Sequence, residues 1–281
     1  MTAFLSPRRI PLTVVLALLV AALVVPFSPA VDKPEAGGQL KLNLRTRIET
    51  FKGSGAWDEA AIVKELPARE TAILICDMWD KHWCQNATKR CDALAKKMEL
   101  VLKAAREQGV LIIHAPSECM DFYKDAPQRK RIQEVKRVEP PKARELTEPP
   151  LPVDASDGGC DDDQPVKSFK AWTRQHPGLT IADDDVISDN GAEIYSFLKQ
   201  RGVKNLVLCG VHTNMCVLGR SFGIRQMTKW GIRCVLIRDL TDSMYNPKKA
   251  PHVSHDEGTE LIVQHIEKYW CPSIVSSDLK K

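Results

Sequence analysis

The sequence predicts one α/β domain in which helices cover both faces of a parallel sheet. Short apolar runs recur along the chain with helix-like segments between them, and this alternation is typical of a parallel sheet. Runs that are almost continuously apolar indicate strands buried on both faces. The four runs are Ala72–Cys76, Val110–Pro116, Val203–Val211 and Ile232–Asp239.

The segments between the runs have the periodicity of amphipathic helices. In the first of them, Leu94, Met98 and Val101 recur at helical intervals, and Gly109 closes the segment as a helix C-terminal glycine. Three further segments fit the same description. They are Gly191–Gly202, Thr213–Gly231 and Gly258–Trp270.

The N-terminal part of the chain is organised differently. Arg8 and Arg9 precede an apolar run from Ile10 to Phe27, and small residues follow at Ser28–Ala30. This layout predicts a signal peptide over residues 1–30 and an exported protein, periplasmic or secreted. The alternative is an uncleaved membrane anchor facing outside the cytoplasm, because the run is long enough to span a bilayer.

An N-terminal extension, residues 31–69, separates that segment from the main domain, residues 70–275. Within it Gly38–Phe51 alternates polar and apolar residues, which predicts a strand of a hairpin with Ala60–Leu66. Inside the main domain, residues 120–165 are rich in proline and charge and predict a long surface excursion. Its acidic string Asp154–Asp163 is typical of a solvated loop, with a calcium site as the alternative.

Composition excludes some classes of function. The chain has 281 residues and a formal net charge of +4 with mixed signs, which does not indicate nucleic-acid binding. It has nine cysteines, an odd number, so an exported chain could form disulfides and still keep a free thiol. The absence of a C-x-x-C motif argues against a thiol–disulfide exchange protein.

Chemistry-bearing residues follow the predicted strands. Ligands of open parallel sheets bind beyond the carboxyl ends of the strands, so these residues are expected at one edge. Cys216 lies about one turn into a predicted helix, where N–H groups and the helix dipole stabilise a thiolate. We therefore expect its pKa to lie below roughly 8.5, with a packed, inert thiol as the alternative. The other strand-end residues are Asp77, His114, His212 and Asp239.

The strings "AILICDMWDKHWC", "LVLCGVHTNMCV" and "GIRCVLIRD" resemble the isochorismatase-like cysteine hydrolases, which include nicotinamidases and N-carbamoylsarcosine amidases. The resemblance covers roughly Glu70–Cys271. It implies a three-layer α/β/α sandwich with a mostly parallel, roughly six-stranded sheet. It also implies Cys216 as nucleophile, Asp77 as base and a cis peptide at Val211–His212. The backbone N–H groups of His212 and Cys216 would then bind the oxyanion.

The lysine of that family has no clear counterpart in this sequence. Arg174 and Lys170 lie 42 and 46 residues before Cys216, and we prefer Arg174 by spacing, with Lys170 as the alternative. Nicotinamidases also hold a metal with an Asp-x-His pair. Asp80 and His82 have that spacing, but they fall in the loop directly after the first strand, where the family does not place its pair, and loop hydrogen bonding is the favoured interpretation. The residues expected to line a substrate pocket are Trp79, His114, Trp172, Asp239 and Tyr245.

These observations predict a cysteine hydrolase that cleaves a small amide or related C–N bond. No cofactor is required, and a divalent metal at Asp80 and His82 is the weaker expectation. One alternative is isochorismatase-type cleavage without thiol catalysis, and another is a catalytically silent binding protein on the same fold. The expected partner is a small-molecule substrate, in a protein that forms homo-oligomers and binds no nucleic acid.

Overall fold

The computed structural model describes residues 1–2, 38–164 and 166–280. The predicted signal peptide or anchor, residues 1–30, therefore lies almost wholly outside the described residues. Among the helices that the structure describes, none is long and apolar enough to cross a membrane. The described residues from 38 onward belong to one compact unit.

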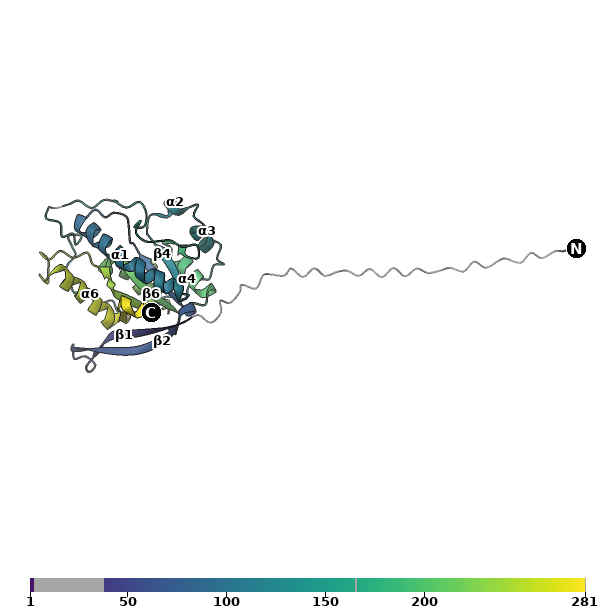
Figure 1. Ribbon diagram of the computed structural model, residues 1–281. Helices are drawn as coiled ribbons and strands as arrows, with labels where there is room; N and C mark the ends of the chain where they lie inside the picture. The colour runs from purple at the N-terminus through teal and green to yellow at the C-terminus, as the bar shows by residue number, and fades with distance from the viewer. Residues whose placement is uncertain (3–37, 165, 281) are drawn as a thin grey trace. The chain divides into compact units, whose positions relative to one another are not determined.

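One eight-stranded sheet organises this unit, in the order β2-β1-β8-β7-β6-β3-β4-β5. Figure 1 shows β4 and β6 within the unit and the hairpin of β1 and β2 at its lower edge. The strands from β8 to β5 pair in parallel, which confirms the predicted parallel sheet. Every residue of β3 and β6 is buried, as their apolar sequences require. The six parallel strands are β3 (Thr71–Cys76), β4 (Leu111–Ala115), β5 (Val186–Ile187), β6 (Asn205–Val211), β7 (Arg233–Asp242) and β8 (Ser273–Ile274).

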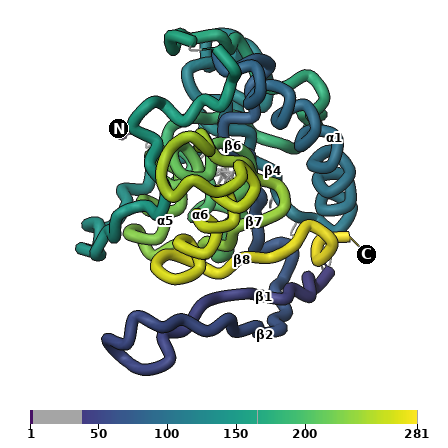
Figure 2. The backbone as a smooth tube through the Cα atoms, turned by 90° about the vertical axis from the view of Figure 1, so that its left-hand side faces the viewer, coloured from purple at the N-terminus to yellow at the C-terminus, as the bar shows by residue number. Residues whose placement is uncertain are grey.

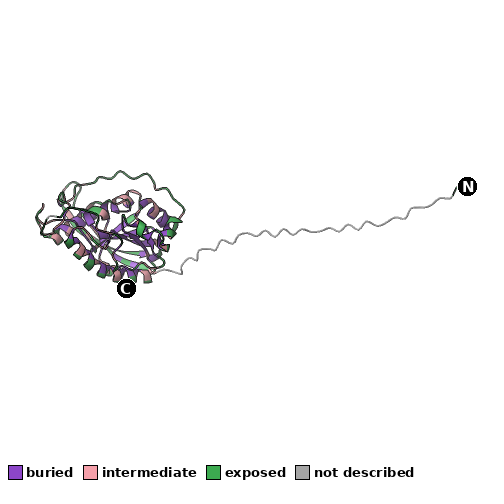
Figure 3. Cartoon of the chain, turned by 90° about the horizontal axis from the view of Figure 1, so that it is seen from above, coloured by how far each residue is buried: buried purple, intermediate pink, exposed green. Residues whose placement is uncertain are grey.

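Helices pack against both faces of this sheet, which confirms the three-layer arrangement. On one face α1 (Gln85–Glu107) buries Ala95, Met98 and Leu102 against β3, and the short helix η3 (Ser276–Leu279) packs beside it. On the other face lie α4 (Gly191–Gln200), α5 (Ile224–Lys229) and α6 (His255–Tyr269). The buried residues of Figure 3 accordingly lie between the layers.

The sheet has two more strands than the roughly six expected, because a hairpin joins its edge. Strands β1 (Gln39–Glu49) and β2 (Trp57–Pro67) pair antiparallel along their full length. Strand β1 then pairs antiparallel with β8 at Arg45 and Ser273. Figure 2 shows the hairpin beside β8, and the short helix η1 (Ala68–Glu70) leads from it into β3.

Two other segments differ from the sequence pattern. The excursion begins with the helices α2 (Met120–Tyr123) and α3 (Pro127–Gln133), and the described residues between α3 and β5 (134–164 and 166–185) form no further helix or strand. The helix expected over Thr213–Gly231 is broken into a π-helical turn η2 (Thr213–Val217) and α5. Gly223, between them, lies so close to the Val217 carbonyl that a Cβ would clash there.

Candidate active site

Asp77 directly follows β3 and is completely buried at the carboxyl edge of the sheet. Its Oδ1 accepts a hydrogen bond from the Ser117 backbone N at 2.7 Å, and Ser117 follows the neighbouring strand β4. Its Oδ2 accepts a hydrogen bond from Arg220 Nε at 2.9 Å, in an ion pair. Asp77 has a φ of 45°, a left-handed conformation that non-glycine residues often adopt at functional sites.

Cys216 lies in η2, the turn that follows the adjacent strand β6. Gly210, near the end of β6, has a φ of 105° and approaches the Cys76 backbone so closely that no Cβ would fit. The next residues carry the non-proline cis peptide at Val211–His212, as the sequence resemblance implied. Cys216 is half-buried, and the six other thiols outside the disulfide are buried.

The Cys216 thiol does not have the lowered pKa that its helix position predicted. Burial and the neighbouring Asp77 charge raise the pKa of Cys216 to about 12, although Arg220 and a hydrogen bond from the His212 backbone oppose them. Burial likewise raises the pKa of Asp77, against the opposing charge of Arg220. The prediction failed because η2 is a single short turn in the protein interior, where desolvation outweighs the stabilising backbone N–H groups.

Arg220, which the sequence analysis did not identify, supplies the cation of this site. It lies four residues after Cys216, and its backbone N donates to the Cys216 carbonyl at 3.0 Å, so both residues lie on one face of a helical turn. Its guanidinium also approaches Glu118 Oε1 through Nη2 at 3.6 Å. The sequence signal was the i, i+4 spacing of "CVLGR", which a search for a lysine upstream of the cysteine overlooks.

The two cations expected from spacing lie elsewhere. Lys170 is exposed, and its Nζ donates to the Glu118 backbone carbonyl at 2.7 Å. Arg174 is also exposed and lies over the Phe122 ring, with 5.7 Å between its guanidinium carbon and the ring centroid. The ion pair with Asp77 is made by Arg220, because the irregular chain before β5 carries Lys170 and Arg174 past Glu118 and Phe122 instead.

Two residues expected in the pocket, Trp79 and Trp172, lie near Cys216. Their rings stack with centroids 4.1 Å apart, and Trp172 and Cys216 both pack against the apolar cluster that contains Trp79. Trp79 Nε1 donates to the Ser117 carbonyl at 3.1 Å, and the Arg220 guanidinium lies 6.0 Å from the Trp79 ring centroid. The site is therefore bounded on one side by an aromatic wall.

The other three expected pocket residues have structural roles. His114 is fully buried. Its Nδ1 forms a hydrogen bond with Gln175 Oε1 and its Nε2 forms one with Asp185 Oδ2, both at 2.9 Å. It therefore faces α1 rather than the strand ends. Tyr245 is also fully buried, and its hydroxyl bridges the Lys249 carbonyl and the Val253 backbone N.

Asp239 does not end β7 as predicted, because this strand continues to Asp242. The register shifts between Leu208 and Gly210 of β6, so that Leu208 pairs with Leu236 but Gly210 pairs with Thr241. This bulge leaves Asp239 exposed, and its carboxylate accepts hydrogen bonds from the Ser276 backbone N and hydroxyl. Asp242 takes the place at the strand end and pairs with His255 Nε2 at 2.9 Å.

The Asp80 and His82 pair is held by loop hydrogen bonds. The Asp80 carboxylate accepts from the backbone N and hydroxyl of Thr173, and His82 Nδ1 accepts from the Cys84 backbone N. Neither residue belongs to a group of three or more ligand side chains within the described part of the chain. The residues present therefore do not assemble a metal site around this pair.

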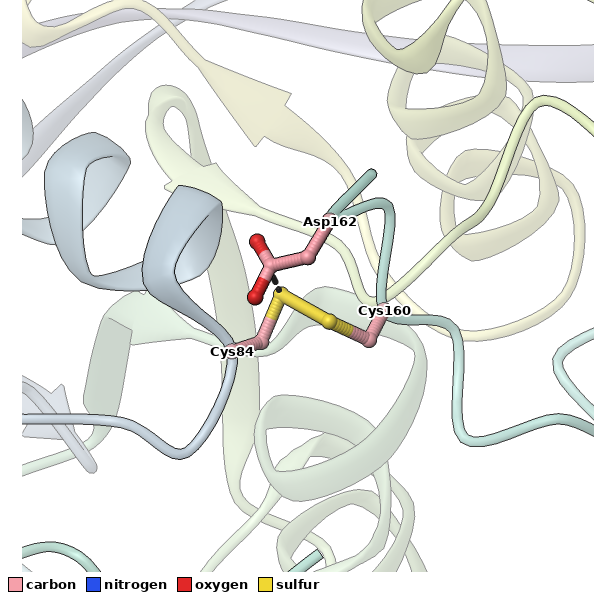
Figure 4. Close-up of side chains that lie close together, drawn as sticks. All are labelled: Cys84, Cys160 and Asp162. Atoms are coloured by element: carbon pink, nitrogen blue, oxygen red, sulfur yellow. Dashed lines mark hydrogen bonds between the residues drawn. A yellow bond between two sulfur atoms is a disulfide. The ribbon is translucent and has the colours of Figure 1, made fainter. Parts of the chain in front are cut away.

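A different group, Cys84, Cys160 and Asp162, brings three ligand-type side chains together (Figure 4). Cys84 and Cys160 form a disulfide with their Cα atoms 5.7 Å apart. A disulfide sulfur lacks the thiolate that binds metals, so this group fits a cross-link better than a metal centre. Asp162 instead accepts hydrogen bonds from the backbone N atoms of Gln85 and Asn86 at the start of α1, each at 2.8 Å.

Comparison with known proteins gives one family match. Residues 188–257, which include β6, Arg220 and the turn that carries Cys216, match the Isochorismatase domain. The chain is therefore similar to this domain over 70 of its 281 residues. A search of curated proteins finds no match to this chain.

Solved structures of isochorismatase-like proteins are similar to this chain at low identity. A cysteine hydrolase from Pseudomonas syringae pv. phaseolicola is 17% identical, with 76% of this chain and 92% of that chain covered and a TM-score of 0.49. An isochorismatase from Pseudomonas putida is 15% identical, with 75% and 90% covered and a TM-score of 0.46. The pyrazinamidase of Pyrococcus horikoshii, solved in complex with zinc, is 16% identical, with 73% and 99% covered and a TM-score of 0.40.

Proposed function

We propose that this protein is an exported cysteine hydrolase that cleaves the C–N bond of a small amide or a related compound. The observation that carries the proposal is the arrangement of Asp77, Arg220 and Cys216 at one edge of the sheet. A buried carboxylate with no cation would be costly, and a silent scaffold has no need to keep one beside a thiol. The three residues together support thiol catalysis over both alternatives.

The proposed reaction starts from a neutral thiol and an ionised carboxylate. Cys216 Sγ attacks the carbonyl carbon as its proton passes to Asp77, and a tetrahedral intermediate forms. The C–N bond then breaks as Asp77 returns the proton to the leaving nitrogen, which leaves a thioester on Cys216. A water molecule attacks the thioester while Asp77 accepts its proton, and the acid product leaves as the thiol is restored.

Backbone N–H groups stabilise the oxyanion in this scheme. The His212 backbone N–H acts on the Cys216 sulfur and lowers its pKa, so this donor is directed at the reacting centre. The Cys216 backbone N–H is the second proposed donor. Fixed donors of this kind need no reorganisation when negative charge develops on the substrate oxygen.

Arg220 takes the place of the lysine of related hydrolases in this proposal. A guanidinium remains charged throughout the accessible pH range and can bind two groups at once, here Asp77 and the charge on sulfur. It therefore orients the base and stabilises the thiolate but transfers no proton. Proton transfer is left to Asp77.

Export is supported by the disulfide as well as by the N-terminal sequence. Disulfides persist in oxidising compartments and are rare in the cytosol. The Cys84–Cys160 bond joins residues 76 positions apart and attaches the excursion to the main domain. Mass spectrometry of the mature protein, with and without reduction, tests both the cleavage near Ala30 and the cross-link.

A panel of small primary amides, ureas and carbamoyl compounds tests the hydrolase proposal by ammonia or amine release. Acid-quenched enzyme should carry the acyl group on the peptide that contains Cys216, as seen by mass spectrometry. Cys216→Ala should abolish both signals. Cys119→Ser is the matched control, since Cys119 lies in the same apolar cluster and should tolerate the change. Turnover that survives in Cys216→Ala would contradict thiol catalysis.

A further inference from the structure

The segment Val153–Asp162, within the excursion, is anchored to two parts of the domain that flank the site. On one side the Asp154 backbone N donates to the Ala250 carbonyl at 2.9 Å, and Asn246 Nδ2 donates to Asp157 Oδ2 at 2.9 Å. These contacts attach the segment to the loop Ser243–Ser254, which connects β7 to α6. Figure 4 shows the other anchor, where Cys160 is bonded to Cys84 at the N-terminus of α1.

Acidic residues strengthen the anchor at α1. Asp162 accepts from the first backbone N–H groups of the helix, which have no partner within the helix itself. Asp161 receives two hydrogen bonds from Arg90, at 2.8 and 3.1 Å. Arg90 also binds Asp242 at the end of β7 at 2.9 Å, so the two anchors are connected to each other.

Met244 is the point at which this segment meets the catalytic turn. Its side chain is 1% exposed and packs in one cluster with Cys84, Cys160 and Trp83. Gly159 has a φ of 70° and lies directly against the Met244 carbonyl, where a Cβ would clash. The disulfide and the glycine therefore fix Met244 from two directions.

Asn214 connects Met244 to the nucleophile. Its Nδ2 donates to the Met244 carbonyl and its Oδ1 accepts from the Met244 backbone N, both at 2.9 Å. Asn214 is 6% exposed and lies in η2 two residues before Cys216. These two hydrogen bonds attach the turn to a backbone position that the cross-linked segment holds in place.

We propose that the disulfide-bonded segment Val153–Asp162 positions the nucleophile turn, and that Asn214 is the positioning residue that transmits this restraint through Met244. The proposal rests on the proposed function in that the positioned thiol is the proposed nucleophile. The restraint itself is independent of substrate. A turn released from Met244 would change the placement of Cys216 relative to Asp77, and sub-ångström placement matters for catalysis.

Two variants test the restraint at its two ends. Cys84→Ser with Cys160→Ser removes the covalent anchor, and Asn214→Leu removes both hydrogen bonds with little change in side-chain volume. In each, native-state hydrogen exchange at the turn amides of Met215 and Val217 should accelerate at least tenfold, while amides of α4 keep their rates. Asn43→Leu is the matched control, because it removes an exposed side-chain amide bond to Asp278.

Alkylation and turnover give the second readout. Asn214→Leu should alter the pH dependence of Cys216 alkylation and lower kcat more than it raises KM. Asn214→Asp keeps the acceptor for the Met244 backbone N, so its kcat should lie between those of Asn214→Leu and the parent protein. If the serine variant does not fold, reduction of the folded parent protein replaces it. Unchanged exchange at the turn after loss of the disulfide and in Asn214→Leu would overturn the proposal. Because exchange is measured without substrate, a protein that hydrolyses nothing could still pass this test.

Discussion

Replacing Asp77 with asparagine should make the Cys216 thiol more reactive while it abolishes hydrolysis. Burial, and after it the negative charge of Asp77, raise the pKa of Cys216 to about 12. The amide has no charge, and Arg220 remains beside the sulfur. Asp77→Asn therefore removes a repulsive charge, keeps an attractive one and eliminates the proposed base.

The size of the effect follows from the charge that is lost. One unit charge about 4 Å away contributes ~4 kcal/mol at an effective dielectric constant of 20, or roughly three pKa units. The thiolate fraction at pH 8 then rises about 1000-fold. A less basic thiolate is a weaker nucleophile, with a Brønsted coefficient of about 0.4–0.5, which reduces the gain to roughly 30-fold in rate.

The assay is the rate of iodoacetamide labelling at each cysteine between pH 6 and 10, read by peptide mass spectrometry. Asp80→Asn is the matched control, because it removes the same charge from a carboxylate that binds Thr173. In the parent protein Cys216 should label slowly at neutral pH, and in Asp77→Asn about 30-fold faster at pH 8. Slower labelling in Asp77→Asn would refute the reasoning, since Asp77 would then be activating the thiol rather than suppressing its ionisation.

Three further predictions concern pH and stability. The pKa of Asp77 is raised, so kcat/KM should fall as the pH decreases through the raised pKa of this carboxyl. Arg220 stays charged and should cause no loss of activity at alkaline pH, whereas Arg220→Lys should introduce such a loss at about pH 10.4. A pH–rate profile of both proteins would reveal this difference. Loss of the Cys84–Cys160 bond should lower the free energy of unfolding by about 4 kcal/mol, measured by urea denaturation with and without reductant. Hydrogen bonds from His114 and Arg106 hold the pKa of Asp185 below its usual value despite burial, so Asp185→Asn should cost about 3 kcal/mol at pH 7. That cost should begin to shrink below pH ~4, where the carboxyl of the unfolded parent chain takes up a proton while the folded carboxyl still resists protonation; an equal cost at pH 3 would contradict the assignment.

The sequence predicted the features of the site that depend on strand ends. Apolar runs locate the strands, and parallel strands bring their carboxyl ends to one edge of the sheet. The sequence alone therefore predicts that Asp77 and Cys216 lie close together. The stacked pair Trp79 and Trp172, expected in the pocket, lies near Cys216, and their part in binding a substrate stays a prediction.

Other features depend on irregular backbone, which periodicity does not describe. The bulge in β7 moves the strand end from Asp239 to Asp242, and nothing in the apolar pattern of this strand indicates the three extra residues. His114 follows the strand rule but is turned toward Asp185 by the alternation of side chains along β4. The cation was expected before Cys216 in the sequence, at a spacing taken from related enzymes. Arg220, which pairs with Asp77, instead follows Cys216 by four residues.

The raised pKa of Cys216 is compatible with catalysis because the site keeps its total charge constant. In the proposed reaction, Asp77 carries the negative charge beside Arg220 before attack, and Cys216 is neutral. After the proposed proton transfer, Asp77 would be neutral and the negative charge would be on sulfur, still next to the same guanidinium. The buried site therefore never holds an unpaired charge, which would be expensive in an interior of low dielectric constant. Burial raises the pKa of both groups, so for each of them the charged form depends on the neighbouring Arg220 guanidinium. A permanently charged arginine suits this exchange, because its charge is available to whichever partner is negative.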